Sequence, residues 1–204
     1  MSFFSLSSLT PLTRLLPTGL VVPIVAGPLK GKKWIVGAAA GEGKGMSIVI
    51  NQSEPIQVSH AVAMLDDSKV CFDFGANVGF YTLLFSLFSK EVYAFEPLPR
   101  NLRYLIRMLE INKVTNAKII PCAVSSSSKI DYFSEGDNQA LGRLDKRGDI
   151  PVLVTTCDQF VSDTNIVPDL LKIDVEGAEL ELLEGARGVL ETSHPLILLS
   201  VHSD

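Results

Sequence analysis

The chain has 204 residues, of which 47% are hydrophobic and 20% charged, and its formal net charge is -5. This length provides one full hydrophobic core and a short additional segment, and it excludes a second complete domain. The acidic balance excludes broad nucleic-acid binding, which needs a basic surface, so we expect no nucleic-acid partner.

Residues 1–66 differ in composition from the rest, and we predict that they form a small N-terminal cap. Prolines and the Gly-rich stretch 37–45 separate short apolar runs. The runs over residues 20–26, 34–36 and 46–50 predict short strands, and a helix is expected over about 57–65. Prolines also interrupt the apolar residues 15–26, which are too few to span a bilayer, so we expect no stable membrane insertion.

Residues 67–204 alternate between strand and helix patterns. Strands are expected over residues 70–74, 92–95, 119–122, 170–173 and 196–201, helices over 80–88, 99–112 and 178–190, and short extended pieces over 130–133 and 152–155. Strands that alternate with helices of this length require right-handed crossovers and a parallel sheet. The expected fold class is therefore α/β, with a doubly wound, mostly parallel sheet.

The three cysteines are Cys71, Cys122 and Cys157, which are widely spaced and lack a C-x-x-C pattern. They read as small core residues and indicate neither a disulfide framework nor a zinc site. We therefore predict a reducing, cytoplasmic location and assign no metal ligands.

A turn with two glycines follows the first strand of this domain. Asp73 lies near the end of the strand, and Gly75, Asn77 and Gly79 follow. Glycines in such a turn permit positive φ and let a ligand approach the backbone closely. Glu96, at the end of the next strand, can accept hydrogen bonds from both ribose hydroxyls of an adenosine cofactor. Turn and carboxylate together predict a nucleotide-cofactor site.

The spacing of this turn favours S-adenosylmethionine over a dinucleotide. A dinucleotide site usually reads G-x-G-x-x-G, whereas this turn has only Gly75 and Gly79. An anion at Asp73 suits the cationic methionine end of S-adenosylmethionine better than a pyrophosphate. Ala123, after the third strand, is small and lies where an adenine ring can rest. A dinucleotide-dependent oxidoreductase is the less favoured alternative.

A second acidic motif, L-L-K-I-D-V-E-G-A-E, spans residues 170–179. Asp174 and Glu176 follow the strand, at the edge where ligands of open α/β sheets bind. Methyl transfer to a hydroxyl must align the reacting atoms and remove the hydroxyl proton, which a carboxylate can accept. We predict Asp174 and Glu176 as catalytic residues, with His202 as a candidate partner. The alternative is that Asp174 shapes the turn and Glu176 caps the next helix.

The chain resembles the FkbM-type methyltransferase family. The matching pieces are D-F-G-A-N-V-G-F-Y-T, V-Y-A-F-E-P, P-C-A-V-S and L-L-K-I-D-V-E-G-A-E. The resemblance implies a Rossmann-like class I methyltransferase fold over residues 67–204, and S-adenosylmethionine-dependent O-methylation of a small-molecule or glycan acceptor, such as a sugar or a polyketide. It implies cofactor contacts at Asp73, Gly75, Asn77, Gly79 and Glu96, and a site role for Asp174 and Glu176.

Two features depart from the family pattern. The family usually has Glu in the last strand, where this chain has Ser200, and its members continue into a final strand pair. We therefore expect a domain truncated after its fifth core strand, and a non-catalytic cofactor-binding protein is a second alternative. The last strand, residues 196–201, is apolar and has no predicted neighbour on one side, so we expect the chain to self-associate through it.

Overall fold

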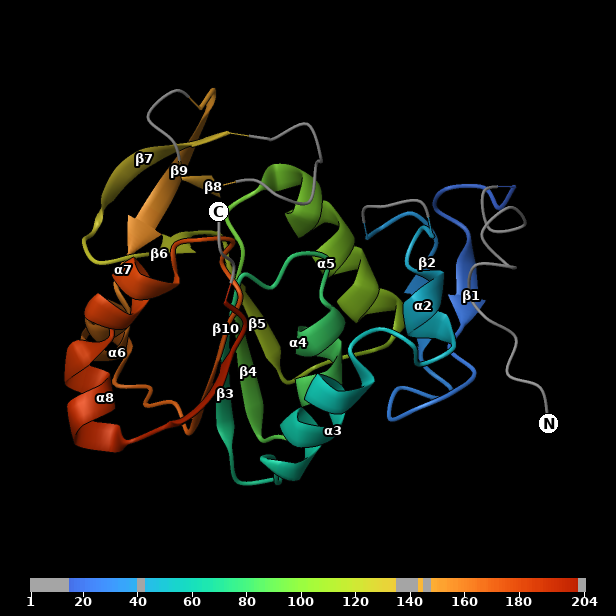
Figure 1. The fold of residues 1–204 in the computed structure, drawn as a ribbon, viewed down its shortest axis with the longest axis horizontal. Helices are drawn as coiled ribbons and strands as arrows, with labels where there is room; N and C mark the ends of the chain where they lie inside the picture. The colour runs from blue at the N-terminus through green and yellow to red at the C-terminus, as the bar shows by residue number, and fades with distance from the viewer. Residues whose placement is uncertain (1–14, 40–42, 135–142, 145–147, 202–204) are drawn as a thin grey trace.

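The computed structural model describes residues 15–39, 43–134, 143–144 and 148–201, and a five-stranded sheet lies at its centre (Figure 1). The strands are β3 (Val70–Phe74), β4 (Glu91–Phe95), β5 (Ala117–Ile120), β10 (Leu170–Ile173) and β11 (Leu196–Leu199). Their order is β11-β10-β3-β4-β5, and every neighbouring pair is parallel. This topology confirms the predicted doubly wound, mostly parallel α/β fold.

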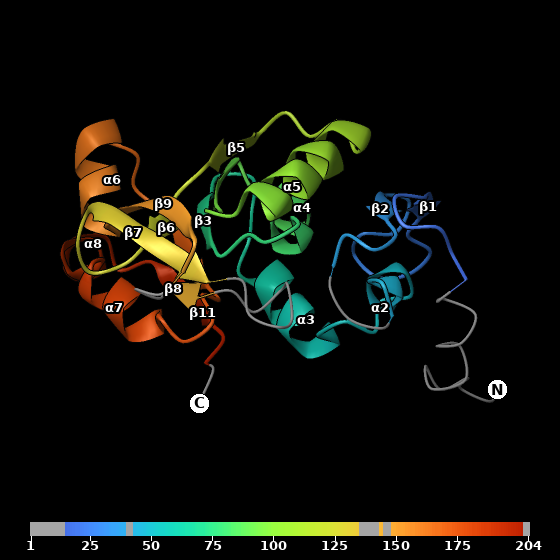
Figure 2. The same cartoon turned by 90° about the horizontal axis from the view of Figure 1, so that it is seen from above.

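Helices cover both faces of the sheet (Figures 1 and 2). They are α4 (Phe80–Phe85), α5 (Pro99–Ile111), α6 (Cys157–Thr164), α7 (Glu179–Glu184) and α8 (Arg187–Ser193). Alternate residues of each central strand face opposite ways, so Cys71 joins the core cluster of α4, whereas Phe72 joins that of α6, α7 and α8. Strands buried on both faces explain the high hydrophobic content of the sequence.

Two helical segments differ from the prediction. The helix expected over residues 178–190 is divided into α7 and α8 near Gly185. A Cβ at this glycine would lie 2.1 Å from the carbonyl oxygen of Ser125, so the chain passes too close to its neighbour for a larger residue. Helix α6 was not predicted, and it begins at a Thr156 side chain that accepts a hydrogen bond from the backbone of Gln159.

The N-terminal segment packs beside α4 and α5 (Figure 2). Strands β1 (Val21–Pro23) and β2 (Lys33–Ile35) pair antiparallel, and helices α2 (Met46–Val49) and α3 (Pro55–Ala63) follow. The strand predicted over residues 46–50 is therefore wrong, because a short apolar run suits a buried helical turn equally well. Trp34 is fully buried in one core cluster with Leu83, and the division of the chain at residue 66 stays a prediction.

A smaller sheet lies beyond the carboxyl ends of the parallel strands (Figure 1). It consists of β6 (Ala123–Val124), β9 (Ile150–Thr155), β7 (Lys129–Ser134) and β8 (Arg143–Leu144), in the order β6-β9-β7-β8. Its inner face carries Phe133 and Val152, which are buried with Ala123. The outer face exposes Ile130 and Leu153, which are opposite each other in the register.

Strand β11 occupies one end of the described parallel sheet and pairs with β10. Leu196, Ile197 and Leu199 are all exposed. Its exposed apolar side chains favour the expected self-association, which stays a prediction. Among the helices of the described residues, none has both the length and the apolar composition that a membrane crossing requires.

Candidate active site

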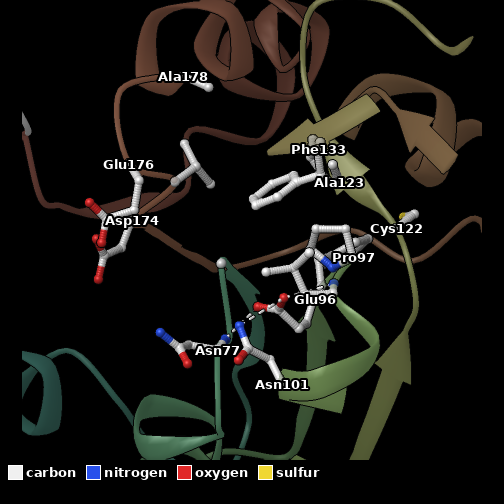
Figure 3. Close-up of a pocket in the computed structure, with 15 residues that line it drawn as sticks. Asn77, Glu96, Pro97, Asn101, Cys122, Ala123, Phe133, Asp174, Glu176 and Ala178 are labelled. Atoms are coloured by element: carbon white, nitrogen blue, oxygen red, sulfur yellow. Dashed lines mark hydrogen bonds between the residues drawn. The ribbon is translucent and has the colours of Figure 1, made fainter. Parts of the chain in front are cut away.

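An open cavity lies at the carboxyl ends of β3, β4 and β10 (Figure 3). Its volume is about 680 Å³ when the solvent-filled space at its opening is included. Six predicted site residues line it: Gly75, Asn77, Ala123, Glu96, Asp174 and Glu176. Asp73 and Gly79 do not line it, and His202 lies outside the described residues.

Glu96 forms the floor of the cavity and is only 4% exposed. Its Oε2 accepts a hydrogen bond from the backbone N–H of Asn77 at 2.8 Å. Its Oε1 accepts bonds from the backbone N–H of Leu98 at 2.9 Å and from the Asn101 amide at 3.2 Å. Burial raises the pKa of Glu96, and these hydrogen bonds oppose that rise. A carboxylate has about four acceptor positions, so three bonds leave capacity for a ligand hydroxyl.

The sequence reasoning missed Asn101 as a partner of Glu96. Asn101 is buried in the first turn of α5, five residues after the carboxylate that it contacts. The sequence did contain a signal, because Asn101 lies on the otherwise apolar face of the helix predicted over residues 99–112. A buried amide is usually hydrogen-bonded, so a polar partner nearby could have been expected.

Gly75 is required by a close approach of two backbones. Its φ is +75°, and a Cβ there would lie 1.9 Å from the carbonyl oxygen of Asp174. The backbone N–H groups of Gly75 and Ala76 both donate to the carbonyl of Phe95, at 3.1 and 3.0 Å. The turn after β3 is therefore held between the turns that follow β4 and β10.

Gly79 and Asp73 serve the interior of the fold in this structure. Gly79 has φ +95°, and a Cβ there would lie 2.7 Å from Cδ1 of Leu105, so it permits close packing of α4 against α5. Asp73 is fully buried, and its Oδ2 accepts a hydrogen bond from the Thr82 hydroxyl at 2.6 Å. Its Oδ1 lies 3.3 Å from Nζ of Lys172. The anion that we expected to face the cofactor is thus paired beneath the cavity.

Asp174 and Glu176 lie on a wall of the cavity, across from Glu96 (Figure 3). Asp174 Oδ2 is 3.4 Å from Nζ of Lys172, and the Asp174 side chain is 26% exposed. Glu176 has a left-handed backbone with φ 53°. Glu179 is buried and accepts a hydrogen bond from the N–H of Gly177 at 3.0 Å. This bond ties the first residue of α7 to the turn that follows β10.

The remaining wall is largely apolar and comes from Phe95, Leu98, Ala123 and Phe133. Such a surface can hold a flat ring. Cys122 also lines the cavity, but burial raises the pKa of its thiol to about 11, so it is protonated at neutral pH. Within the ranges that the structure describes, no group of three or more His, Cys, Asp and Glu side chains could hold a metal ion.

A family model for the methyltransferase FkbM domain matches residues 73–204, which begin at Asp73 and include the whole cavity. The chain belongs to the FkbM methyltransferase family. This membership confirms the predicted resemblance, and it gives S-adenosylmethionine as the cofactor.

Two relatives are similar in sequence. Hexuronic acid methyltransferase AglP of Haloferax volcanii is 27% identical over 143 residues, which are 68% of this chain and 58% of the relative. Methyltransferase 1 of Beauveria bassiana is 24% identical over 161 residues, covering 64% of this chain and 63% of the relative. The chain thus spans less than two thirds of the length of these two proteins.

Solved structures show weaker likeness. The methyltransferase FkbM of Methylobacillus flagellatus KT is 22% identical with a TM-score of 0.48, covering 65% of this chain and 32% of that one. A Streptococcus mutans protein in complex with SAH is 17% identical with a TM-score of 0.43, covering 68% and 66%. The fold assignment therefore rests on the strand order and register of this chain.

Proposed function

We propose that this chain transfers the methyl group of S-adenosylmethionine to a hydroxyl oxygen of a sugar or another small-molecule acceptor. The observation that carries the proposal is the presence of acidic groups on the floor and on one wall of the same cavity. Glu96, on the floor and held by three N–H donors, lies across the cavity from Asp174 and Glu176.

The carboxylates and the apolar wall of the cavity support S-adenosylmethionine as its ligand. Bound there, the cofactor supplies an electrophilic methyl group on a positively charged sulfur. Glu96 would accept hydrogen bonds from its ribose hydroxyls, and Ala123 and Phe133 would contact its adenine ring. The carboxylates that line the cavity favour a cationic ligand, because opposite charges attract more strongly in a partly desolvated site.

Asp174 is the group that we assign to the acceptor hydroxyl. It lines the cavity, is partly exposed, and has one oxygen directed to Lys172. Its carboxylate can orient the hydroxyl and accept its proton while the methyl group is transferred. Glu176, from the same turn, lies on the same wall and is the second candidate.

Three further observations bear on the acceptor and on location. The similarity to AglP, a hexuronic acid methyltransferase, supports a sugar-type acceptor. The net charge of -5 supports a small acceptor over a nucleic acid. The three cysteines are free and buried, which supports the cytoplasm as the location.

The test is methyl transfer from isotopically labelled S-adenosylmethionine to a panel of neutral sugars, hexuronic acids and polyketide aglycones. Mild alkali then separates the products, because it cleaves methyl esters of carboxyl groups and leaves methyl ethers intact. We expect an alkali-stable product from at least one acceptor. Binding of S-adenosylhomocysteine without transfer to any acceptor would support the non-catalytic alternative, and an alkali-labile product would contradict the assignment to hydroxyl oxygen.

A further inference from the structure

Lys172 lies in β10 beneath the cavity and is the one lysine or arginine that is fully buried among the described residues. Its Nζ lies 3.3 Å from Asp73 Oδ1 and 3.4 Å from Asp174 Oδ2. It also donates a hydrogen bond to the carbonyl oxygen of Gly75 at 3.0 Å. The ring of Tyr81 lies 5.2 Å from Nζ, which is within the range of a cation–π contact.

These contacts compensate the charge of the ammonium group. Its hydrogen bond goes to the Gly75 carbonyl, and the two carboxylates lie within ion-pair distance of Nζ. Burial lowers the pKa of Lys172, but Asp73 and Asp174 outweigh that effect and raise it overall. Lys172 is therefore a cation at neutral pH, and its two carboxylate partners compensate a charge that would otherwise be costly to bury.

The three partners of Lys172 come from two adjacent strand ends. Asp73 and Gly75 belong to β3 and its turn, and Asp174 follows β10. Gly75 and Asp174 line the cavity, whereas Asp73 lies below it and is itself fixed by the Thr82 hydroxyl. The Lys172 side chain thus connects the buried Asp73 to the turn after β3 and to the turn after β10.

We propose that Lys172 is a positioning residue, which fixes the Asp174 carboxylate and the Gly75 turn at the wall of the cavity. The expected effect of Lys172 on turnover rests on the function proposed above. The expected ordering of the two turns by Lys172 is independent of that function, because it follows from the contacts alone.

Turnover is measured first, with Lys172→Met, Lys172→Arg and, as a matched control, Lys118→Met. Lys118 is also paired with a glutamate and lies over a tyrosine ring, but it is exposed and remote from the cavity. We expect Lys172→Met to lower kcat by about 10²-fold, since misplacement of a catalytic group by about 1 Å has effects of that size. The affinity for S-adenosylhomocysteine, measured by calorimetry, should change far less, and Lys172→Arg should recover part of kcat.

Two double variants separate positioning from fold stability. If Lys172 acts through Asp174, Lys172→Met should add little to the loss caused by Asp174→Asn. The double variant Lys172→Met/Asp73→Asn removes both buried charges, so it restores folding if the single variant fails for lack of charge compensation. We expect its kcat to stay low. Recovery of kcat in this variant, or additive losses with Asp174→Asn, would overturn the proposal.

Amide hydrogen exchange without substrate gives a readout that is independent of turnover. We expect faster exchange at residues 75–79 and 174–177 in the Lys172 variants that lack the charge, with unchanged rates in Lys118→Met. Unchanged protection of both turns would overturn the inference about Lys172. If the wild-type chain methylates no acceptor while the two turns respond as expected, the proposed function fails and the role of Lys172 in ordering them stands.

Discussion

The floor and the wall of the cavity hold their carboxylates by different means. Glu96, on the floor, is 4% exposed and is held by three neutral N–H donors. Asp174, on the wall, is 26% exposed and is held by the ammonium of Lys172. Neutral dipoles orient a carboxylate and leave its net charge uncancelled, whereas an adjacent cation orients it and cancels much of that charge. The floor therefore suits tight hydrogen bonding of a ligand, and the wall suits orientation of a reacting group.

Substitution at the wall should have the largest effect. We expect Asp174→Asn to reduce kcat by roughly 10²-fold or more, because the side-chain volume is kept while the proton acceptor is lost. Calorimetry should show nearly unchanged affinity for S-adenosylhomocysteine. Glu176→Gln, in the same turn, should reduce kcat less. Full activity of Asp174→Asn would return Asp174 to the turn-shaping role.

Substitution at the floor should give the complementary result. We expect Glu96→Ala to weaken S-adenosylhomocysteine binding by roughly 1–3 kcal/mol through lost charge-assisted hydrogen bonds. Calorimetry on Glu96→Ala and Asp174→Asn in parallel tests the comparison directly. Equal affinity in wild type and Glu96→Ala would refute the assignment of Glu96 to the ribose. Weak binding by both variants would show that Asp174 also contributes to cofactor binding, against the division of roles between floor and wall.

The smallest effect that we expect is on the pH dependence of stability. It compares Glu91, which begins β4, with Glu96, which directly follows this strand. Burial raises the pKa of Glu96 above its usual value of 4.5, so the stability of the wild type relative to Glu96→Gln should fall as the pH rises through that raised value. Glu91 begins the same strand, and its hydrogen bond with Lys118 lowers its pKa. The wild type should therefore gain stability relative to Glu91→Gln as the pH rises through the lowered value.

Urea unfolding of the ligand-free proteins at a series of pH values measures both differences. The opposite signs make each variant the control for the other. Parallel slopes for Glu96→Gln and Glu91→Gln would contradict the distinction between a desolvated carboxylate and one paired with a partly exposed lysine.

The sequence predicted the features that depend on local pattern. The buried strands β3, β4 and β10 are short and mostly apolar, and Gly75, Glu96 and Asp174 directly follow them. The family motifs added the cofactor. Each of these signals lies within a few residues of the position that it identifies. A single sequence was therefore sufficient to predict these strands and the site residues that follow them.

The remaining features depend on contacts between distant segments. Met46–Val49 is a short apolar run that suits a strand or a buried helical turn equally well, and in the structure it is a helix with Ile48 and Val49 in the core. Gly185, between α7 and α8, lies against the backbone of the distant Ser125, and Phe133 reaches the cavity from the small sheet. Asp73 and Gly79 lie outside the lining of the cavity and contact Lys172 and Leu105, which are distant in sequence, and their predicted cofactor contacts stay a prediction.

The sequence separation of the contacts has a consequence for the order of folding. The bond that fixes Glu96 to the turn after β3 joins residues 19 apart, whereas the bond from Lys172 to Gly75 joins residues 97 apart. Local contacts form early and non-local strand pairing forms late, because closing a long loop costs more entropy. On the ribosome, the floor can therefore form while β10 is still being synthesised. We expect the nascent chain to order Glu96, the proposed ribose partner, before Asp174, the proposed proton acceptor, so that the proposed cofactor contact forms before the proposed catalytic group.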